Sequence, residues 1–313
     1  MKFCLSIEIQ EGLDYPATLA LARAGEAVGF DAALLAEHYY ASSGHLDRMA
    51  ADAWVFLGAL ARETDRIRLG TLVSPVTFRH PAVLAKMATS LDHLSGGRAE
   101  LGLGAGWLAA EHAAHGFPFP PGPARVDLLE EQLQVITGLW SEDPFSHTGS
   151  HYRLEECHFT PQPVQRPRLP LLIGGTPTAT RLPRLAARYA DEYVLGLGTP
   201  AQCRAVRERL DRDCTAAGRD PRAVSLALFA GVCVAETERE VERTLARLME
   251  GARPHMQDLD TWVLGTPERA AEQLRAFAAA GVGRLMFSVD HDLHREMVTL
   301  LGERVAPLVR AAV

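Results

Sequence analysis

Residues 66–86, RIRLGTLVSPVTFRHPAVLAK, begin with the pattern of a β-strand and end with that of a helix. The run 67–73 is short and apolar, as in a buried strand, and Pro81 suits the first position of a helix over 81–94. A surface turn is normally built from Gly, Asn, Asp and Ser, yet this turn is apolar. The stretch therefore predicts a strand–turn–helix unit whose turn is either a sturdy connection or the wall of a site.

The same alternation of strand and helix patterns runs along the chain and predicts parallel βαβ units. Strands are expected at 3–9, 31–36, 67–73, 99–104, 169–174, 192–196, 225–235 and 284–289. The first helix is expected to open at Asp14 and Pro16, and later helices cover about 50–63, 81–94, 177–190, 200–217, 237–251, 266–280 and 292–312. Repeated units of this kind predict an α/β fold, a (β/α)8 TIM barrel. IEIQEGLDYP, at the first strand, lacks the glycine fingerprint of an open dinucleotide-binding sheet.

Residues 1–313 are predicted to form one barrel domain that carries an insertion. The segment 107–165 is too long for a strand-to-helix loop and is rich in Pro, Gly and His. We expect it to lie over one end of the barrel, after strand four, with one helix at about 124–140.

Composition narrows the function classes. With 313 residues, 47% of them hydrophobic and 23% charged, the chain is typical of soluble globular proteins. Its net charge of −7 offers no basic face for nucleic acid or for a membrane surface, so a small molecule is the expected partner. Five scattered cysteines without a CxxC pair argue against a disulfide framework and a zinc ribbon. The amino terminus lacks a signal-peptide pattern and no apolar run is long enough to span a membrane, so a cytoplasmic location is expected.

Function in such barrels lies at the carboxyl ends of the strands. After strand two come Glu37 and His38, and an imidazole beside a carboxylate is suited to proton exchange near neutral pH. The alternative is a rim histidine packed against Tyr39 and Tyr40. After strand three, the apolar turn could press against a flat ligand, or Val73 and Val76 could cap the barrel core while Arg79 pairs with an acidic neighbour.

Two glycine-rich strand ends follow. In LGLGAGW, glycines at every second position, Gly102, Gly104 and Gly106, would let a ring system approach the backbone, although the spacing fails the dinucleotide motif. The nearby EHAAH lacks the spacing of a zinc motif, so no metal site is expected. In LLIGGTPTATR, Gly174, Gly175 and Thr176 lead into the helix expected from Pro177, with Thr176 as its N-cap, and such a helix start favours a phosphate site that Arg181 could support.

Several motifs, in this order along the chain, resemble the bacterial luciferase-like family of flavin or deazaflavin oxidoreductases, and most of all its coenzyme F420-dependent branch. They are GFDAALLAEHYY (29–40), residues 66–86, LDHLSGGRAELGLGAGW (91–107), EHAAHGFPFP (111–120), LPLLIGGTPTATRLPRLAARYAD (169–191) and GTPERAAEQLRAFAAAGVGRLMF (265–287). The resemblance implies a barrel with an insertion after strand four, usually a homodimer. It also implies a cis peptide bond at Leu72–Val73 behind the cofactor ring, and a cofactor phosphate at Gly174, Gly175 and Thr176.

The expected function is hydride transfer between coenzyme F420 and a small organic substrate. Leu72, Val73, Ala105 and Gly106 would hold the ring. His38 would exchange a proton and Glu37 would orient it, while Phe78, Trp107 and Glu111 would line the substrate pocket by position.

Three alternatives stay open. Family members with the deazaflavin often carry Asp-His, and flavin monooxygenases often carry Glu-His-His, where this chain has Glu37-His38-Tyr39. An FMN-dependent monooxygenase that uses reduced flavin and oxygen is therefore the first alternative. The others are a metal-dependent barrel hydrolase that uses His38 and His80, and a cofactor-binding protein without catalysis.

Overall fold

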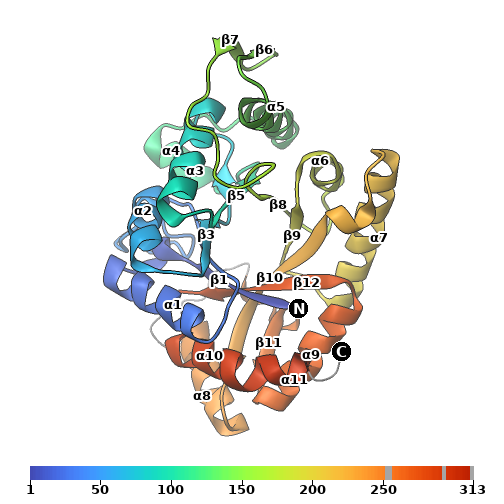
Figure 1. Cartoon of the computed structure of the whole chain (residues 1–313). Helices are drawn as coiled ribbons and strands as arrows, with labels where there is room; N and C mark the ends of the chain where they lie inside the picture. The colour runs from blue at the N-terminus through green and yellow to red at the C-terminus, as the bar shows by residue number, and fades with distance from the viewer. Residues whose placement is uncertain (251–255, 291–293, 311–313) are drawn as a thin grey trace.

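The computed structural model describes residues 1–250, 256–290 and 294–310, and these form a closed parallel β-barrel surrounded by helices (Figure 1). Around the barrel, the eight strands are β1 (Lys2–Ile7), β2 (Ala32–Leu35), β3 (Arg68–Thr71), β5 (Ala99–Gly104), β8 (Leu171–Gly175), β9 (Glu192–Gly196), β10 (Ser225–Val234) and β12 (Val282–Val289). Strand β10 pairs in parallel with both β9 and β12, and these pairings close the ring. The predicted (β/α)8 barrel is confirmed.

The helices that follow the strands lie outside the barrel. They include α1 (Tyr15–Ala27), α2 (Ala53–Glu63), α3 (Pro81–Ser95), α6 (Leu182–Tyr189), α7 (Pro200–Ala216) and α9 (Pro267–Ala279). The starts of α1 and α2 follow the capping rules: the Asp14 carboxylate accepts from the Ala17 amide, and the Asp52 carboxylate accepts from the amides of Trp54 and Val55. None of the described helices is long and apolar enough to cross a bilayer.

The third strand stops earlier than predicted. Strand β3 ends at Thr71, and the chain continues through Leu72 and Val73 into β4 (Ser74–Pro75), which pairs with the carboxyl end of β5. The peptide bond between Leu72 and Val73 is cis, as the resemblance implied. The apolar turn thus lies against the barrel rather than on the outer surface.

The chain between β5 and β8 contains more structure than predicted. The expected helix is present as α5 (Gly122–Ser141), but α4 (Ala109–His115) and a hairpin of β6 (Phe145–Thr148) and β7 (Arg153–Cys157) were missed. The Glu131 carboxylate on α5 accepts hydrogen bonds from the amides of His151 and Tyr152 at 3.0 and 2.7 Å and so ties the hairpin to the helix. Figure 1 shows the hairpin at the top, far from the barrel strands.

The structure differs from prediction at other places as well. Helix α6 begins at Leu182 rather than 177. Beyond α8 (Glu238–Met249), a short strand, β11 (Trp262–Gly265), pairs with the far end of β10 and was missed. The helices predicted at 237–251 and 292–312 extend into residues 251, 292–293 and 311–312, which lie outside the described residues. The described part of the last one comprises α10 (His294–Leu300), a π-helical turn (Leu301–Val305) and α11 (Ala306–Arg310).

The barrel interior is closed at the amino ends of its strands by a buried ion-pair network. Arg284, near the start of β12, lies 2.9 Å from a Glu100 carboxylate oxygen and 3.1 Å from one of Glu192. Burial alone would raise the pKa of Glu100, but Arg284 and Arg68 hold it below its usual value. Small and apolar side chains, including Cys4, Ala32 and Ala227, fill the layer above. A ligand can therefore reach the interior from the carboxyl ends of the strands.

Candidate functional site

A cavity of about 470 Å³ opens at the carboxyl ends of the strands. It is lined by residues from several strand exits: Glu8, Ala36, His38, Ser42, Leu72, Val73, Gly104, Ala105, Gly106, Trp107, Gly174, Gly175, Thr176, Leu182, Val194, Gly196, Leu197 and Phe229. All seven residues predicted to bind the cofactor are on this wall. The structure thus brings together the exits of strands β2, β3, β5 and β8, as a barrel fold requires.

The wall at Leu72 and Val73 is packed on glycines. A Cβ added to Gly104 would lie 2.6 Å from Val73 Cγ2, and one added to Gly102 would lie 2.1 Å from the Thr71 carbonyl oxygen. These two glycines therefore make room for the residues that follow β3. The expectation that they leave space for a ring is wrong for Gly102, which is not on the cavity wall, and incomplete for Gly104.

His38 is held by a carboxylate from the insertion. Its Nδ1 lies 3.0 Å from Glu111 Oε2, which also accepts a hydrogen bond of 2.9 Å from the Tyr39 amide. An ionised carboxylate only accepts, so Nδ1 is the donor and Nε2 is the nitrogen with which His38 can serve a ligand. Glu111 is fully buried and contacts His38. It does not line the cavity, so the prediction that it forms part of the pocket wall is corrected.

Glu37 does not make the predicted contact with His38. Its buried carboxylate accepts hydrogen bonds from the Arg79 guanidinium, the Ser74 hydroxyl and the Trp54 indole N–H. Neighbouring residues at the end of a strand point to opposite sides, so two consecutive side chains cannot share one face. The orienting contact predicted for Glu37 is therefore made by Glu111. Burial raises the pKa of Glu37, and the Arg79 guanidinium opposes that effect.

Arg79 and His80 face away from the cavity. The Arg79 guanidinium donates to Glu37, to the Tyr39 hydroxyl at 2.7 Å and to Asp52 at 3.2 Å, which is the acidic pairing considered as an alternative. His80 caps helix α3 by accepting from the Ala82 amide. Among the residues that the structure describes, no cluster of three His, Cys, Asp or Glu side chains could hold a metal ion.

The segment after β8 lines the cavity as a loop. Helix α6 begins only at Leu182, so Thr176 is not its N-cap and the helix-start argument for a phosphate fails in its original form. Thr176 Oγ1 lies 3.3 Å from the Thr178 hydroxyl, and Arg181 pairs with Asp127 of α5 at 2.6 Å. This segment contributes Gly174, Gly175 and Thr176 to the cavity wall, and Leu182 at the start of α6 also lines it.

Of the other two residues predicted for the substrate pocket, Trp107 lines the cavity and Phe78 does not. Trp107 is 54% exposed and meets the His38 ring edge-on with the ring centres 5.7 Å apart. Phe78 lies outside the cavity, in an aromatic cluster with Tyr39 and Phe117 at centre distances of 5.2 and 5.0 Å. Phe78 therefore packs against the residue that follows His38 and is not on the cavity wall.

Sequence reasoning missed cavity residues at the other strand exits. Glu8 follows β1, Gly196 and Leu197 lie at the end of β9, and Phe229 lies within β10. Leu197 adopts a left-handed backbone with φ of 48°, which is uncommon for a residue with a side chain. The rule that points to strand exits could have found Glu8 and Gly196, whereas no local signal marks Leu197 or Phe229.

Comparisons with known proteins agree with this architecture. The family model described as luciferase-like monooxygenase matches residues 1–284. An FMNH2-dependent dimethylsulfone monooxygenase of Pseudomonas fluorescens is 27% identical, and the match covers 96% of this chain and 88% of that protein. An F420-dependent glucose-6-phosphate dehydrogenase of Microbacterium testaceum is 30% identical over 87% of this chain and 80% of its own length. The solved structure of an F420-dependent secondary alcohol dehydrogenase with an F420-acetone adduct superposes with a TM-score of 0.83, covers 99% of both chains and is 21% identical. The chain therefore belongs to the luciferase-like monooxygenase family of oxidoreductases.

Proposed function

We propose that this protein transfers a hydride between coenzyme F420 and a small organic substrate in the cavity at the carboxyl ends of the strands. The observation that carries the proposal is the pairing of an apolar wall with one oriented imidazole. Leu72, Val73 and Phe229 supply the wall, and His38, held by Glu111, supplies the proton-exchanging group.

The cavity residues fit a flat ring of this kind. A volume of about 470 Å³ lies within the roughly 300–1,000 Å³ that small-molecule sites occupy. Apolar side chains and the backbone of Ala105 and Gly106 would pack against the ring. The segment Gly174–Thr176 would hold the phosphate, since it brings two residues without bulky side chains and a hydroxyl to one side of the cavity.

The deazaflavin ring, when bound, supplies hydride chemistry. The chain's own residues supply position and proton exchange. His38 Nε2 would give a proton to, or take one from, the substrate oxygen, and the Nδ1 contact with Glu111 would fix the ring for that exchange. Trp107 would cover the open side of the site and help to exclude water.

The test is turnover of F420 with small alcohols and carbonyl compounds by the wild-type protein and by His38→Ala. Loss of a proton-exchanging group costs about 10²–10⁴ in rate. We expect His38→Ala to keep cofactor affinity and lose turnover by that factor. Equal turnover in the variant would overturn the role of His38.

A reduced-FMN monooxygenase is the second candidate. It is favoured by the dimethylsulfone monooxygenase relative, whose match covers 96% of this chain. The choice between the two cofactors depends on which one the cavity binds more tightly, and titration with each cofactor measures this.

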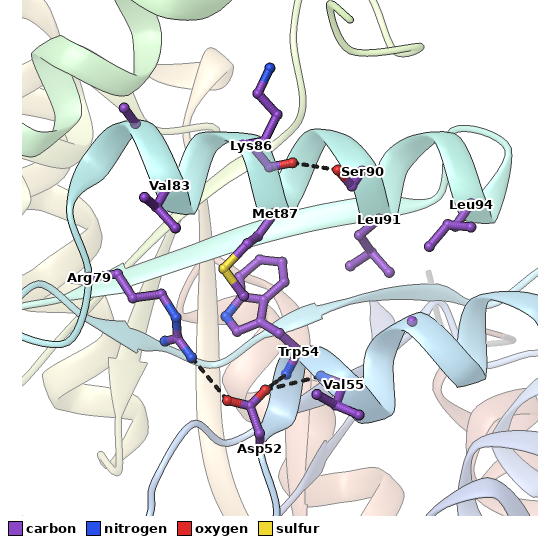
Figure 2. A pocket seen from close by; sticks show the side chains of 12 residues that line it. Asp52, Trp54, Val55, Arg79, Val83, Lys86, Met87, Ser90, Leu91 and Leu94 are labelled. Carbon is purple, nitrogen blue, oxygen red and sulfur yellow. Dashed lines mark hydrogen bonds and ion pairs between the residues drawn. The ribbon is translucent and has the colours of Figure 1, made fainter. Parts of the chain in front are cut away.

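We also propose that the protein is a cytoplasmic homodimer. All five cysteines are free, which suits a reducing compartment. A second cavity of about 760 Å³ lies between α2 and α3, and exposed Val55, Val83 and Leu94 surround it. Figure 2 shows Trp54 of α2 and Met87 of α3 meeting between the two helices. An exposed apolar surface of this kind is typical of a protein contact, and the resemblance points to a second copy as its partner.

A further inference from the structure

We propose that Arg79 is a positioning residue. It fixes two parts of the cavity lining, the Leu72–Val73 segment and His38, relative to each other. The inference deepens the proposed function and rests on it for the readouts that involve cofactor and turnover. Arg79 itself does not line the cavity at the strand ends. It acts through two chains of hydrogen bonds that leave its guanidinium in different directions.

The first chain leads to the ring-facing wall. Arg79 donates to one oxygen of Glu37, and the other oxygen of Glu37 accepts from the Ser74 hydroxyl. The Ser74 hydroxyl also lies 3.1 Å from Thr71 Oγ1. Thr71 and Ser74 flank Leu72 and Val73 on either side. Glu37 therefore holds the Ser74 end of the two-residue wall segment directly, and Ser74 in turn contacts Thr71 at the other end.

The second chain leads to His38. Arg79 Nη2 donates to the Tyr39 hydroxyl at 2.7 Å, and the Tyr39 amide donates to Glu111 Oε2 at 2.9 Å. The same Glu111 oxygen accepts from His38 Nδ1 at 3.0 Å. A shift of the Tyr39 side chain would move the backbone that shares this acceptor with His38. One guanidinium thus connects the wall and the imidazole, which come from different strand exits.

Arginine suits this position because its planar group offers five N–H donors in fixed directions. Here they reach Glu37, Tyr39 and Asp52, and Figure 2 shows the Asp52 contact at the end of the groove between α2 and α3. A lysine ammonium has three donors at a single point and cannot span the same set of acceptors. A buried ion pair is also a weak source of net stability, since apolar replacement of both partners is often neutral. A role in geometry accounts for the pair better than a role in stability.

Arg98 provides a matched control. It is a partly buried arginine of the same strand–helix region, but it lies at the opposite end of the barrel. Its guanidinium donates to the backbone carbonyls of Ala61, Thr64 and Ile67 at 2.7–2.9 Å. Arg98→Met therefore removes a comparable set of hydrogen bonds without touching either chain to the cavity.

The experiment compares Arg79→Met, Arg79→Lys, Arg98→Met and the double variant Arg79→Met/Glu37→Gln. Displacement of a positioned group by about 1 Å can cost about 10² in rate. We expect both Arg79 variants to bind cofactor about tenfold more weakly and to turn over about 10²-fold more slowly per folded molecule. Arg98→Met should lower the melting temperature and leave both values within about twofold. The double variant should regain stability, because no buried charge is left unpaired, but not affinity.

A second readout needs no cofactor. In the ligand-free protein, the proton on His38 Nδ1 should give a downfield NMR signal that is assigned by its loss in His38→Gln. We expect this signal to weaken in Arg79→Met and to persist in Arg98→Met. Wild-type affinity, turnover and ring signal in Arg79→Met, or equal losses in Arg98→Met, would overturn the proposal. If the wild-type protein bound neither cofactor, the proposed function would fail, while the ring signal would still decide the role of Arg79.

Discussion

His38 and Glu111 are 73 residues apart in the sequence, and their side chains meet at 3.0 Å beside the cavity. The imidazole comes from the exit of β2, and the carboxylate comes from α4 of the insertion. The insertion therefore does more than cover the barrel, because it supplies the buried acceptor that fixes the histidine.

Replacement of Glu111 should impair catalysis without emptying the cavity. Glu111→Gln keeps the size of the side chain but removes the charge that holds His38 Nδ1–H. We expect kcat to fall by about 10–100-fold, a part of the roughly 10²–10⁴ that a proton-exchanging group contributes, with little change in cofactor affinity. Steady-state kinetics and cofactor titration measure the two quantities. Glu130→Gln, in the neighbouring helix α5, is the control and should match the wild type. A kcat unaffected by Glu111→Gln would contradict the orienting role.

The glycine behind Val73 offers a steric test of the wall. In Gly104→Ala the new Cβ would lie 2.6 Å from Val73 Cγ2, so Val73 must shift, and the cavity is the open side. We expect about tenfold weaker cofactor binding, and recovery in the double variant Gly104→Ala/Val73→Ala, which removes the clash. Gly58→Ala on α2 is the control, because its added Cβ meets nothing within 4 Å. Fluorescence titration reports the affinities, and weaker binding that the second substitution fails to restore would count against this packing.

Glu131 gives the hairpin of the insertion a pH-dependent clamp. Burial would raise the pKa of this carboxyl, but the amides of Tyr152 and His151 lower it below its usual value. A carboxyl with a lowered folded-state pKa stabilises the fold above its unfolded pKa of about 4.3, and this contribution is lost as the pH falls through the folded value. Glu131→Gln should thus lower the free energy of unfolding by about 1–3 kcal/mol at pH 7. The difference from wild type should shrink below pH 4. Urea unfolding at several pH values measures it, and a difference independent of pH would refute the clamp.

The homodimer proposal makes a prediction about surface charge. Val83 is 52% exposed beside the groove between α2 and α3, so Val83→Glu would place a charge within the proposed contact. We expect light scattering to show a dimer for the wild type and a monomer for this variant, because burial of an unpaired charge is costly. Leu308→Glu, on α11, is the control and should remain dimeric. A monomeric wild type, or a dimeric Val83→Glu, would refute this interface.

Local patterns predicted the barrel well because the hydrophobic periodicity of strands and helices, and the residues at their ends, can be recognised within short stretches of sequence. The strands at 99–104 and 192–196 match β5 and β9 residue for residue, and Pro81 starts α3 as expected. The rule that function lies at strand exits also selected residues that the structure brings together. Seven predicted residues from three exits proved to line one cavity.

The errors arose where a contact is long-range or two local signals compete. Glu37 is next to His38 in sequence, but the alternation of a strand sends it to Arg79, and nothing near His38 in sequence indicates Glu111. Thr176-Pro177 and Leu182-Pro183 both resemble helix starts, and the structure uses the second. Strand β11 has only four residues and depends on pairing with the far end of β10, so its own sequence could not identify it.

The most direct test of the central claim is a titration of the purified protein with oxidised coenzyme F420 and, separately, with FMN. Absorbance of each ring and quenching of tryptophan fluorescence report binding, since Trp107 lies on the cavity wall. We expect F420 to bind at least about tenfold more tightly than FMN, about 1.4 kcal/mol, and Gly104→Ala to weaken this binding. Tight FMN binding without F420 binding would establish the flavin alternative. Binding of neither cofactor would contradict the claim that this cavity is a redox site.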